Sequence, residues 1–180
     1  MMKVLVKKIL LFLFLPLRKR KQKRDGVTDQ VNRQELPNAI LLGMVKEAIK
    51  EGHTATIAVK GYSMRPFLEH LRDKVLLEPV TKPLAINDAI LAEIHPGHYV
   101  LHRIIKLDGS NITMMGDGNI GQTESCTTSN VVGIVTEYIR PKRSIKADDP
   151  QLMRKIRLWR RLLPARRLLL VLYKASIGVD

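Results

Sequence analysis

The stretch Gly61-Tyr62-Ser63-Met64-Arg65-Pro66 decides the interpretation of this chain, because a strand gives way there to a turn. The preceding run, Thr54-Ala55-Thr56-Ile57-Ala58-Val59-Lys60, is rich in β-branched residues and predicts a strand that ends at Gly61. Pro66 restricts the residue before it and so favours a turn ahead of the short amphipathic segment 67–71. A hydroxyl on such a turn is exposed and held by rigid backbone, as a nucleophile requires. Ser63 is therefore the candidate nucleophile.

A serine hydroxyl is a weak nucleophile unless a base removes its proton, so the sequence must also supply a base. His102 lies in the apolar run 99–105, which predicts a second strand. An imidazole can take the serine proton and later give it to the leaving amine. A third predicted strand, 111–115, runs into the turn Gly116-Asp117-Gly118-Asn119. Asp117 in this turn is the candidate that orients or electrostatically supports His102.

Four motifs occur in order, and together they resemble the superfamily of signal peptidase I and LexA-type serine peptidases. They are G-x-S-M-x-P at 61–66, V-x-H-R-I at 100–104, M-x-G-D-G-N at 114–119 and V-V-G-I-V at 131–135. The likeness covers residues 53–138, and a histidine rather than a lysine at position 102 resembles the archaeal and endoplasmic-reticulum branch. The resemblance implies a coiled, partly barrel-like antiparallel sheet. It also implies an extended substrate bound along a strand edge near residues 55–61.

The chain departs from the signal peptidase pattern after Asp117. Those enzymes commonly carry another aspartate a few residues later, where this chain has Thr123 followed by Glu124. Three arrangements stay open: Asp117 suffices, Glu124 is the third member, or the site is a Ser63–His102 dyad.

A second departure concerns the stabilisation of the oxyanion. Signal peptidases often place a hydroxyl residue two positions before the nucleophile, where this chain has Gly61, as in the LexA-like branch. The backbone N–H of Ser63 is the expected donor to the developing oxyanion. Gly61, Tyr62 and Met64 are expected to form the surrounding substrate and oxyanion region.

The spacing of apolar runs and turn residues predicts a mostly β fold with flanking helices. Besides 54–60 and the strands named above, strands are expected at 75–78, 89–94 and 131–138. An amphipathic helix begins at Pro37 and ends near Gly52, which takes the C-cap role. The signal peptidase-like catalytic domain is therefore expected over 37–145.

The formal charge of +14 is unevenly distributed along the 180 residues. Residues 1–25 carry a net charge of +8 and residues 151–180 carry +7, whereas residues 26–150 carry −1. Both ends are also rich in leucine, which suits an anionic membrane surface better than a DNA groove. Nucleic acid binding by basic tails is the competing interpretation.

The most apolar segment is 3–17, whose uninterrupted apolar part spans 9–17 and is followed by the basic run 18–24. Nine apolar residues are too few for a standard membrane span, and no small-residue cleavage site follows them. Two interpretations are open, a membrane-contacting anchor or a poorly ordered extension. Residues 26–36 are polar and are expected to form a linker.

Residues 146–180 predict a basic helical extension. Asp149 suits the N-cap of a helix with Pro150 at its first position, and Pro164 should break or kink it before it resumes at 166. Its expected apolar face comprises Leu152, Ile156, Trp159 and Leu163. This face lies on a membrane or a partner, or it packs on the catalytic domain.

The sequence predicts neither a metal nor a cofactor. It has no Walker loop, no dinucleotide fingerprint and no CxxC pair. His95, His98 and His102 are spaced like metal ligands, but Pro96-Gly97 breaks any helix and an extended strand would separate the last two. The lone Cys126 allows no internal disulfide and is better interpreted as a packed thiol than as a nucleophile.

Taken together, these features predict a membrane-associated serine endopeptidase that cleaves a peptide or pre-protein next to small residues. Apart from this membrane association, the protein is expected to be cytoplasmic. Two alternatives come from other classes: a LexA-type self-cleaving regulatory peptidase, and a catalytically inactive scaffold that docks on membranes through its ends.

Overall fold

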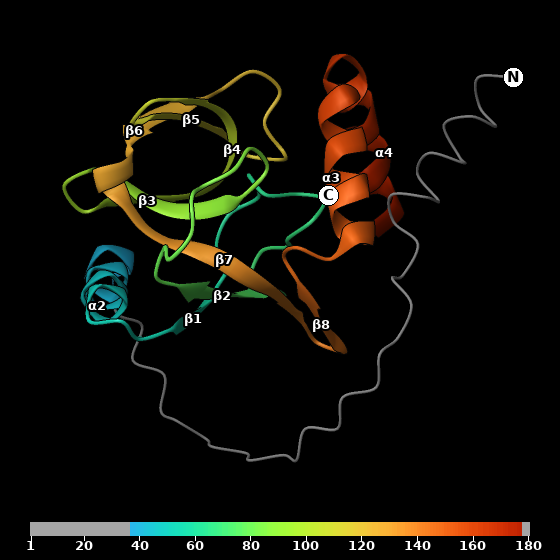
Figure 1. Cartoon of the computed structure of the whole chain (residues 1–180). Coiled ribbons are helices and arrows are strands. Elements are labelled where there is room, and N and C mark those ends of the chain that lie inside the picture. Colours follow the sequence, from blue (N-terminus) through green and yellow to red (C-terminus); the bar gives the residue numbers. More distant parts are fainter. Residues whose placement is uncertain (1–36, 178–180) are drawn as a thin grey trace, which may run out of the picture.

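A computed structural model describes residues 37–177, which form one antiparallel sheet with helices on either side of it in the sequence (Figure 1). Helix α2 (Asn38–Lys50) comes first, and α3 (Pro150–Arg161) and α4 (Arg166–Ile177) come last. The strands are β1 (Ala55–Ala58), β2 (Lys74–Glu78), β3 (Ala89–His95), β4 (His98–Asp108), β5 (Asn111–Met115), β6 (Glu124–Thr127), β7 (Val131–Arg140) and β8 (Arg143–Lys146). The expected N-terminal extension and the linker at 26–36 lie outside the described residues.

The eight strands are arranged in the order β1-β2-β7-β3-β4-β5-β6, with β8 paired to β7. Every pairing is antiparallel, and Figure 1 shows that β3 to β6 curl around a common axis. Register shifts in the β2–β7, β3–β7 and β4–β5 pairs bend the strands and support this curvature. The sheet does not close, since β1 and β6 stand at opposite ends of the strand order. The prediction of a mostly β fold with flanking helices is confirmed.

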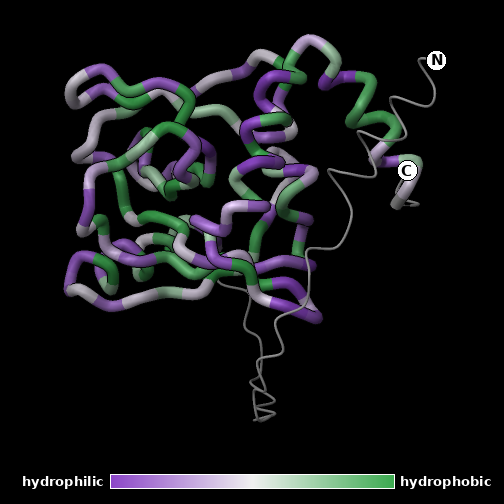
Figure 2. The backbone as a smooth tube through the Cα atoms, turned by 45° about the vertical axis from the view of Figure 1, so that its right-hand side comes forward, coloured by the Kyte–Doolittle hydropathy of each residue, from purple (hydrophilic) through white to green (hydrophobic). Residues whose placement is uncertain are grey.

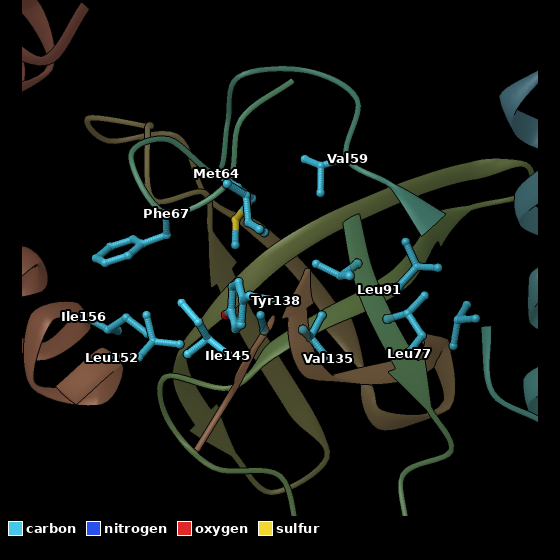
Figure 3. Close-up of a cluster of buried hydrophobic side chains, with 14 of the residues drawn as sticks. Val59, Met64, Phe67, Leu77, Leu91, Val135, Tyr138, Ile145, Leu152 and Ile156 are labelled. Atoms are coloured by element: carbon cyan, nitrogen blue, oxygen red, sulfur yellow. The ribbon is translucent and has the colours of Figure 1, made fainter. Parts of the chain in front are cut away.

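Two apolar clusters fill the molecule. The smaller one lies inside the curled strands and includes Ile90, Ile104 and Met114. The larger one joins the sheet to α2, to the segment after β1 and to the C-terminal helices, and Figure 3 shows part of it. Its labelled members from the C-terminal region and from that segment are Val59, Met64, Phe67, Ile145, Leu152 and Ile156.

The C-terminal helices pack on the sheet domain, and their burial decides between the two interpretations of their apolar face. Leu152, Ile156 and Trp159 are fully buried in the larger cluster, and Leu169 and Tyr173 of α4 are buried as well. The expectation that this face lies on a membrane or a partner is therefore wrong for α3. Residues 146–177 share their core with residues 37–145, so the helices are part of the same packed unit.

A second, exposed side of α4 carries apolar residues too. Leu168 and Val171 are 55% and 59% exposed, and Figure 2 shows hydrophobic residues in green along this last helix. Across residues 37–177 no helix combines the length and the apolar character that crossing a bilayer requires.

Trp159 is expected to be a strong contributor to stability through a single hydrogen bond. Its indole Nε1 donates to the backbone oxygen of Asp117 over 2.7 Å, and the side chain is fully buried. Replacing Trp159 with phenylalanine leaves that oxygen without this donor, so the free energy of unfolding should fall by about 1–3 kcal/mol. Urea denaturation measures the change. Leu168→Ala, at an exposed position of α4, should stay within about 0.5 kcal/mol of wild type.

Candidate active site

Ser63 lies in a compact loop, residues 61–72, that connects β1 to β2. Gly61 adopts φ +93°, a left-handed conformation that favours glycine, and its N–H donates to Nδ1 of His70 over 2.8 Å. On the other side of Ser63, the Met64 side chain is buried in the larger core. Ser63 is therefore held between a hydrogen-bonded turn and a core anchor, and its own side chain is half-buried.

Arg65 ties the same loop to the C-terminal helix. Its Nε donates to Oε2 of Glu69 over 2.9 Å, and its guanidinium lies 4.1 Å from the centre of the exposed Tyr62 ring. The other carboxylate oxygen of Glu69 accepts the hydroxyl of Tyr173 on α4 over 2.6 Å. Burial and the hydrogen bond to Glu69 raise the pKa of Tyr173, so this phenol stays protonated and keeps donating.

His102, in the middle of β4, is 5% exposed and hydrogen-bonded through one ring nitrogen. Its Nδ1 lies 2.6 Å from Oε2 of Glu124, the first residue of β6. An ionised carboxylate only accepts, so this contact assigns the proton to Nδ1 and leaves Nε2 as the acceptor. The tautomer that a general base needs toward a serine hydroxyl is thereby selected.

Gly116 is the point where Ser63 and His102 meet. An ideal Cβ built on Gly116 would lie 3.0 Å from both His102 Nε2 and Ser63 Cβ. Both atoms therefore lie close to Gly116, and they are separated by at most twice that distance. Among the described residues no hydrogen bond joins the Ser63 hydroxyl to the imidazole; such bonds often tighten only when substrate is bound.

Among the described residues Asp117 forms no hydrogen bond with His102 and is paired with Arg103 instead, which corrects the expectation that it orients the base. Both of its oxygens accept from Arg103, with Nε to Oδ1 at 2.9 Å and Nη2 to Oδ2 at 2.6 Å. Burial by itself opposes the charge on Arg103, but Asp117 and then Tyr138 outweigh it and raise the Arg103 pKa. Asp117 is the structural partner of a fully buried guanidinium, and Glu124 takes the position next to the base.

The structure brings three of the expected residues together, namely Ser63, His102 and Glu124. Tyr62 is exposed beside them, as a substrate-contacting residue would be. The side chain of Met64 is buried, and the N–H of Gly61 is already engaged by His70, so neither of these groups faces a substrate.

The second loop of the site, 116–121, is held from the C-terminal side of the chain. Trp159 donates to the Asp117 backbone oxygen, and Nη1 of Arg166 donates to the Asn119 backbone oxygen over 2.8 Å. Sequence reasoning missed Arg103, Trp159, Arg166 and Gly116 as supporting residues. Side-chain alternation could have identified Arg103, because it places His102 and Arg103 on opposite faces of the same strand.

The close approach at Gly116 gives a prediction. An alanine there would place its Cβ 2.4 Å from the Ser63 backbone oxygen, which would force the nucleophile loop away from the histidine. We expect Gly116→Ala to cost about 1–3 kcal/mol of stability, as overpacking does, and to slow modification of Ser63 by a fluorophosphonate. Gly121→Ala is the matched control, because no heavy atom lies within 4 Å of its added Cβ.

Among the described residues, neither a group of metal-ligating side chains nor the cysteine forms a rival site. Within residues 37–177 no three His, Cys, Asp or Glu side chains are grouped to hold an ion. Cys126 is half-buried at the edge of the smaller core, and burial raises the pKa of its thiol, which disfavours the reactive thiolate.

The sequence matches no protein-family model, and the search of curated proteins finds no match either.

Proposed function

We propose that this protein is a serine endopeptidase of the signal peptidase type, with Ser63 as the nucleophile and His102 as the general base. Glu124 is proposed as the residue that orients His102. One observation carries the proposal: Ser63 Cβ and Nε2 of His102 both lie 3.0 Å from the Cβ position of Gly116, while Nδ1 of His102 is held by a carboxylate. Acyl transfer requires a nucleophile, a base close to it and a group that orients the base.

In the proposed first half-reaction, Ser63 Oγ attacks the carbonyl carbon of the scissile peptide bond and Nε2 of His102 takes the hydroxyl proton. The backbone N–H of Ser63 is the proposed donor to the resulting oxyanion. When the C–N bond breaks, the imidazolium gives its proton to the leaving amine, and an ester on Ser63 remains. In the second half-reaction His102 takes a proton from water, the hydroxide attacks the ester, and the proton returns to Ser63.

Glu124 supports both half-reactions electrostatically. Each creates an imidazolium at His102, and a carboxylate 2.6 Å from Nδ1 stabilises that positive charge. Because His102 is 5% exposed, water screens the interaction less than it would at the surface.

The proposed substrate is an extended peptide segment that adds to the sheet at β1. This strand pairs only with β2 among the described strands and stands at the end of the strand order, so its outer edge can accept another strand. The chain runs from β1 directly into the Ser63 loop, which would place a peptide on that edge beside the nucleophile.

We further propose that the enzyme works at an anionic membrane surface. Residues 150–177 contain eight Lys or Arg and no Asp or Glu, and Leu168 and Val171 project from α4 among these charges. Exposed aliphatic side chains with basic neighbours suit the interface of an acidic bilayer. Co-sedimentation with phosphatidylglycerol vesicles should weaken in the double variant Leu168→Ser, Val171→Ser. Equal sedimentation of wild type and variant would contradict this part of the proposal.

Peptide cleavage tests the proposed activity. The protein is incubated with a mixture of unstructured peptides of varied sequence, and mass spectrometry identifies the products. We expect internal cleavage by wild type and by Ser110→Ala, which alters an exposed serine, but none by Ser63→Ala or His102→Ala. Cleavage by Ser63→Ala at the wild-type rate would reject the proposal. No cleavage by any form would favour the inactive scaffold.

A further inference from the structure

His70 lies near the far end of the loop 61–72, yet its ring faces the turn that precedes Ser63. Its Nδ1 accepts the backbone N–H of Gly61 over 2.8 Å. An imidazole nitrogen accepts a hydrogen bond only when it carries no proton, so this contact assigns the His70 proton to Nε2. His102 holds the opposite tautomer, with its proton on Nδ1 toward Glu124. The two histidines are therefore prepared for different tasks.

Backbone hydrogen bonds place His70 opposite Gly61. The N–H of Leu71 donates to the Val59 carbonyl over 2.7 Å, and the N–H of Val59 donates to the Asp73 carbonyl over 2.9 Å. The two ends of the loop are thereby joined. Leu71 adopts φ +54°, a left-handed conformation that is uncommon for residues other than glycine. Such conformations persist where the surrounding contacts fix them, and they are frequent at functional sites.

The imidazole of His70 is also held from its side by Tyr62. The two ring centres lie 5.2 Å apart, and the ring planes are inclined by 53°. Tyr62 contacts the guanidinium of Arg65, which is buried and bonded to Glu69. These contacts connect the imidazole to the buried part of the loop, so packing as well as hydrogen bonding sets its orientation.

The Ser63 backbone is fixed from both directions along the chain. After the nucleophile, the Ser63 carbonyl accepts the N–H of Gly118 over 2.6 Å. Before the nucleophile, the turn contains Gly61 at φ +93°, and the hydrogen bond to His70 holds it there. Glycine has more accessible backbone conformations than any other residue, so this hydrogen bond restrains the most adaptable position of the turn.

We infer that His70 is a positioning residue of the proposed peptidase, whose Nδ1 fixes the turn that presents the Ser63 hydroxyl and backbone N–H. This role rests on the proposed function, and His70 acts through Gly61 rather than on the reacting atoms. Because Gly61 is exposed, water can satisfy its N–H when the imidazole is removed, so stability should change little. Water does not hold the turn in one orientation, and a misplacement of about 1 Å can slow a reaction about a hundredfold.

Fluorophosphonate labelling of full-chain variants tests this role. His70→Phe keeps an aromatic ring beside Tyr62 but has no acceptor, and we expect it to slow labelling of Ser63 by about tenfold to a hundredfold. His70→Asn replaces Nδ1 with an amide oxygen that can accept the Gly61 N–H, so labelling should return to near the wild-type rate. His53→Phe is the matched control, because His53 is exposed and lies outside the loop, and it should label like wild type.

Hydrogen exchange at the Gly61 amide is the second measurement, and it does not depend on activity. Exchange should be faster in His70→Phe and close to wild type in His70→Asn. His70→Ala, which also lacks an acceptor, replaces His70→Phe if the latter does not fold.

The outcomes separate a failure of this role from a failure of the proposed function. If wild type is labelled at Ser63 but His70→Phe is labelled as fast, or His70→Asn is slowed as much as His70→Phe, His70 does not position the nucleophile and the proposed function stands. Equal exchange of the Gly61 amide in wild type and His70→Phe would likewise overturn the role. If wild type is not labelled at Ser63, the proposed function fails, and the role of His70 fails with it.

Discussion

Replacing Glu124 with glutamine is expected to slow the reaction of Ser63 with a fluorophosphonate by about four orders of magnitude, without unfolding the protein. Glutamine keeps the shape of the side chain but removes its negative charge. Its amide can also donate to Nδ1, which favours the imidazole tautomer that carries its proton on Nε2. That tautomer cannot accept the Ser63 proton, and the imidazolium formed during attack is no longer stabilised.

The measurement is the second-order rate constant of labelling, followed by intact mass. Glu78→Gln is a matched control, because Glu78 lies at the end of β2 outside the group formed by Ser63, His102 and Glu124. We expect circular dichroism and the melting temperature of Glu124→Gln to match wild type closely, since Glu124 is partly exposed. If Glu124→Gln is labelled at a rate within a few-fold of wild type, His102 is oriented by a different group or by none.

The second large effect is expected on stability, when the carboxylate of Asp117 is removed. Asp117→Ala should lower the free energy of unfolding by about 3–5 kcal/mol, because it leaves the fully buried Arg103 without its ionic partner. Chemical denaturation measures this change. The reason is structural, so the double variant Arg103→Met, Asp117→Leu, which removes both buried charges, should recover part of the lost stability.

This experiment also separates the two carboxylates by the kind of effect that each variant produces. Asp117→Ala should alter stability first and labelling only through the displaced loop, whereas Glu124→Gln should alter labelling first. If Asp117→Ala folded with wild-type stability but lost labelling of Ser63, the assignment of Asp117 to Arg103 would be wrong.

The sequence predicted the strands that contain a clear apolar run and missed the two that lack one. Strand β6 begins with Glu124 and is short and polar, and β8 has a single buried residue, Ile145, among charged and polar neighbours. Both strands are defined by their pairing, β6 with β5 and β8 with β7, which their amino-acid composition does not indicate. The segment 67–71, which is amphipathic in sequence, forms turns.

The candidate site was predicted in part, for reasons that lie in the strand geometry. Ser63 and His102 follow from a strand–turn boundary and a histidine in a strand, which are local signals. The partner of His102 depends on how β6 returns to the sheet, and no local pattern fixes that. Asp117 looked catalytic because it sits in a turn beside Gly116, but the structure pairs it with Arg103. Glu124 had been one of the open alternatives.

The C-terminal helices show how composition can mislead. Their high positive charge suggested a surface element, yet Trp159, Arg166 and Tyr173 each bond to a loop of the candidate site. A long amphipathic side chain such as arginine can be buried when its guanidinium finds backbone acceptors, as Arg166 does at Asn119. The helices therefore support the loops that hold Ser63 and Asp117.

The most direct test of the central claim is to map the site of covalent modification by a fluorophosphonate. Wild-type protein is labelled, digested and sequenced by mass spectrometry, in parallel with His102→Ala. We predict a single adduct on Ser63 in wild type and no detectable adduct on Ser63 in His102→Ala. An adduct on another residue, or equal modification of Ser63 in both proteins, would contradict the proposal that His102 activates Ser63.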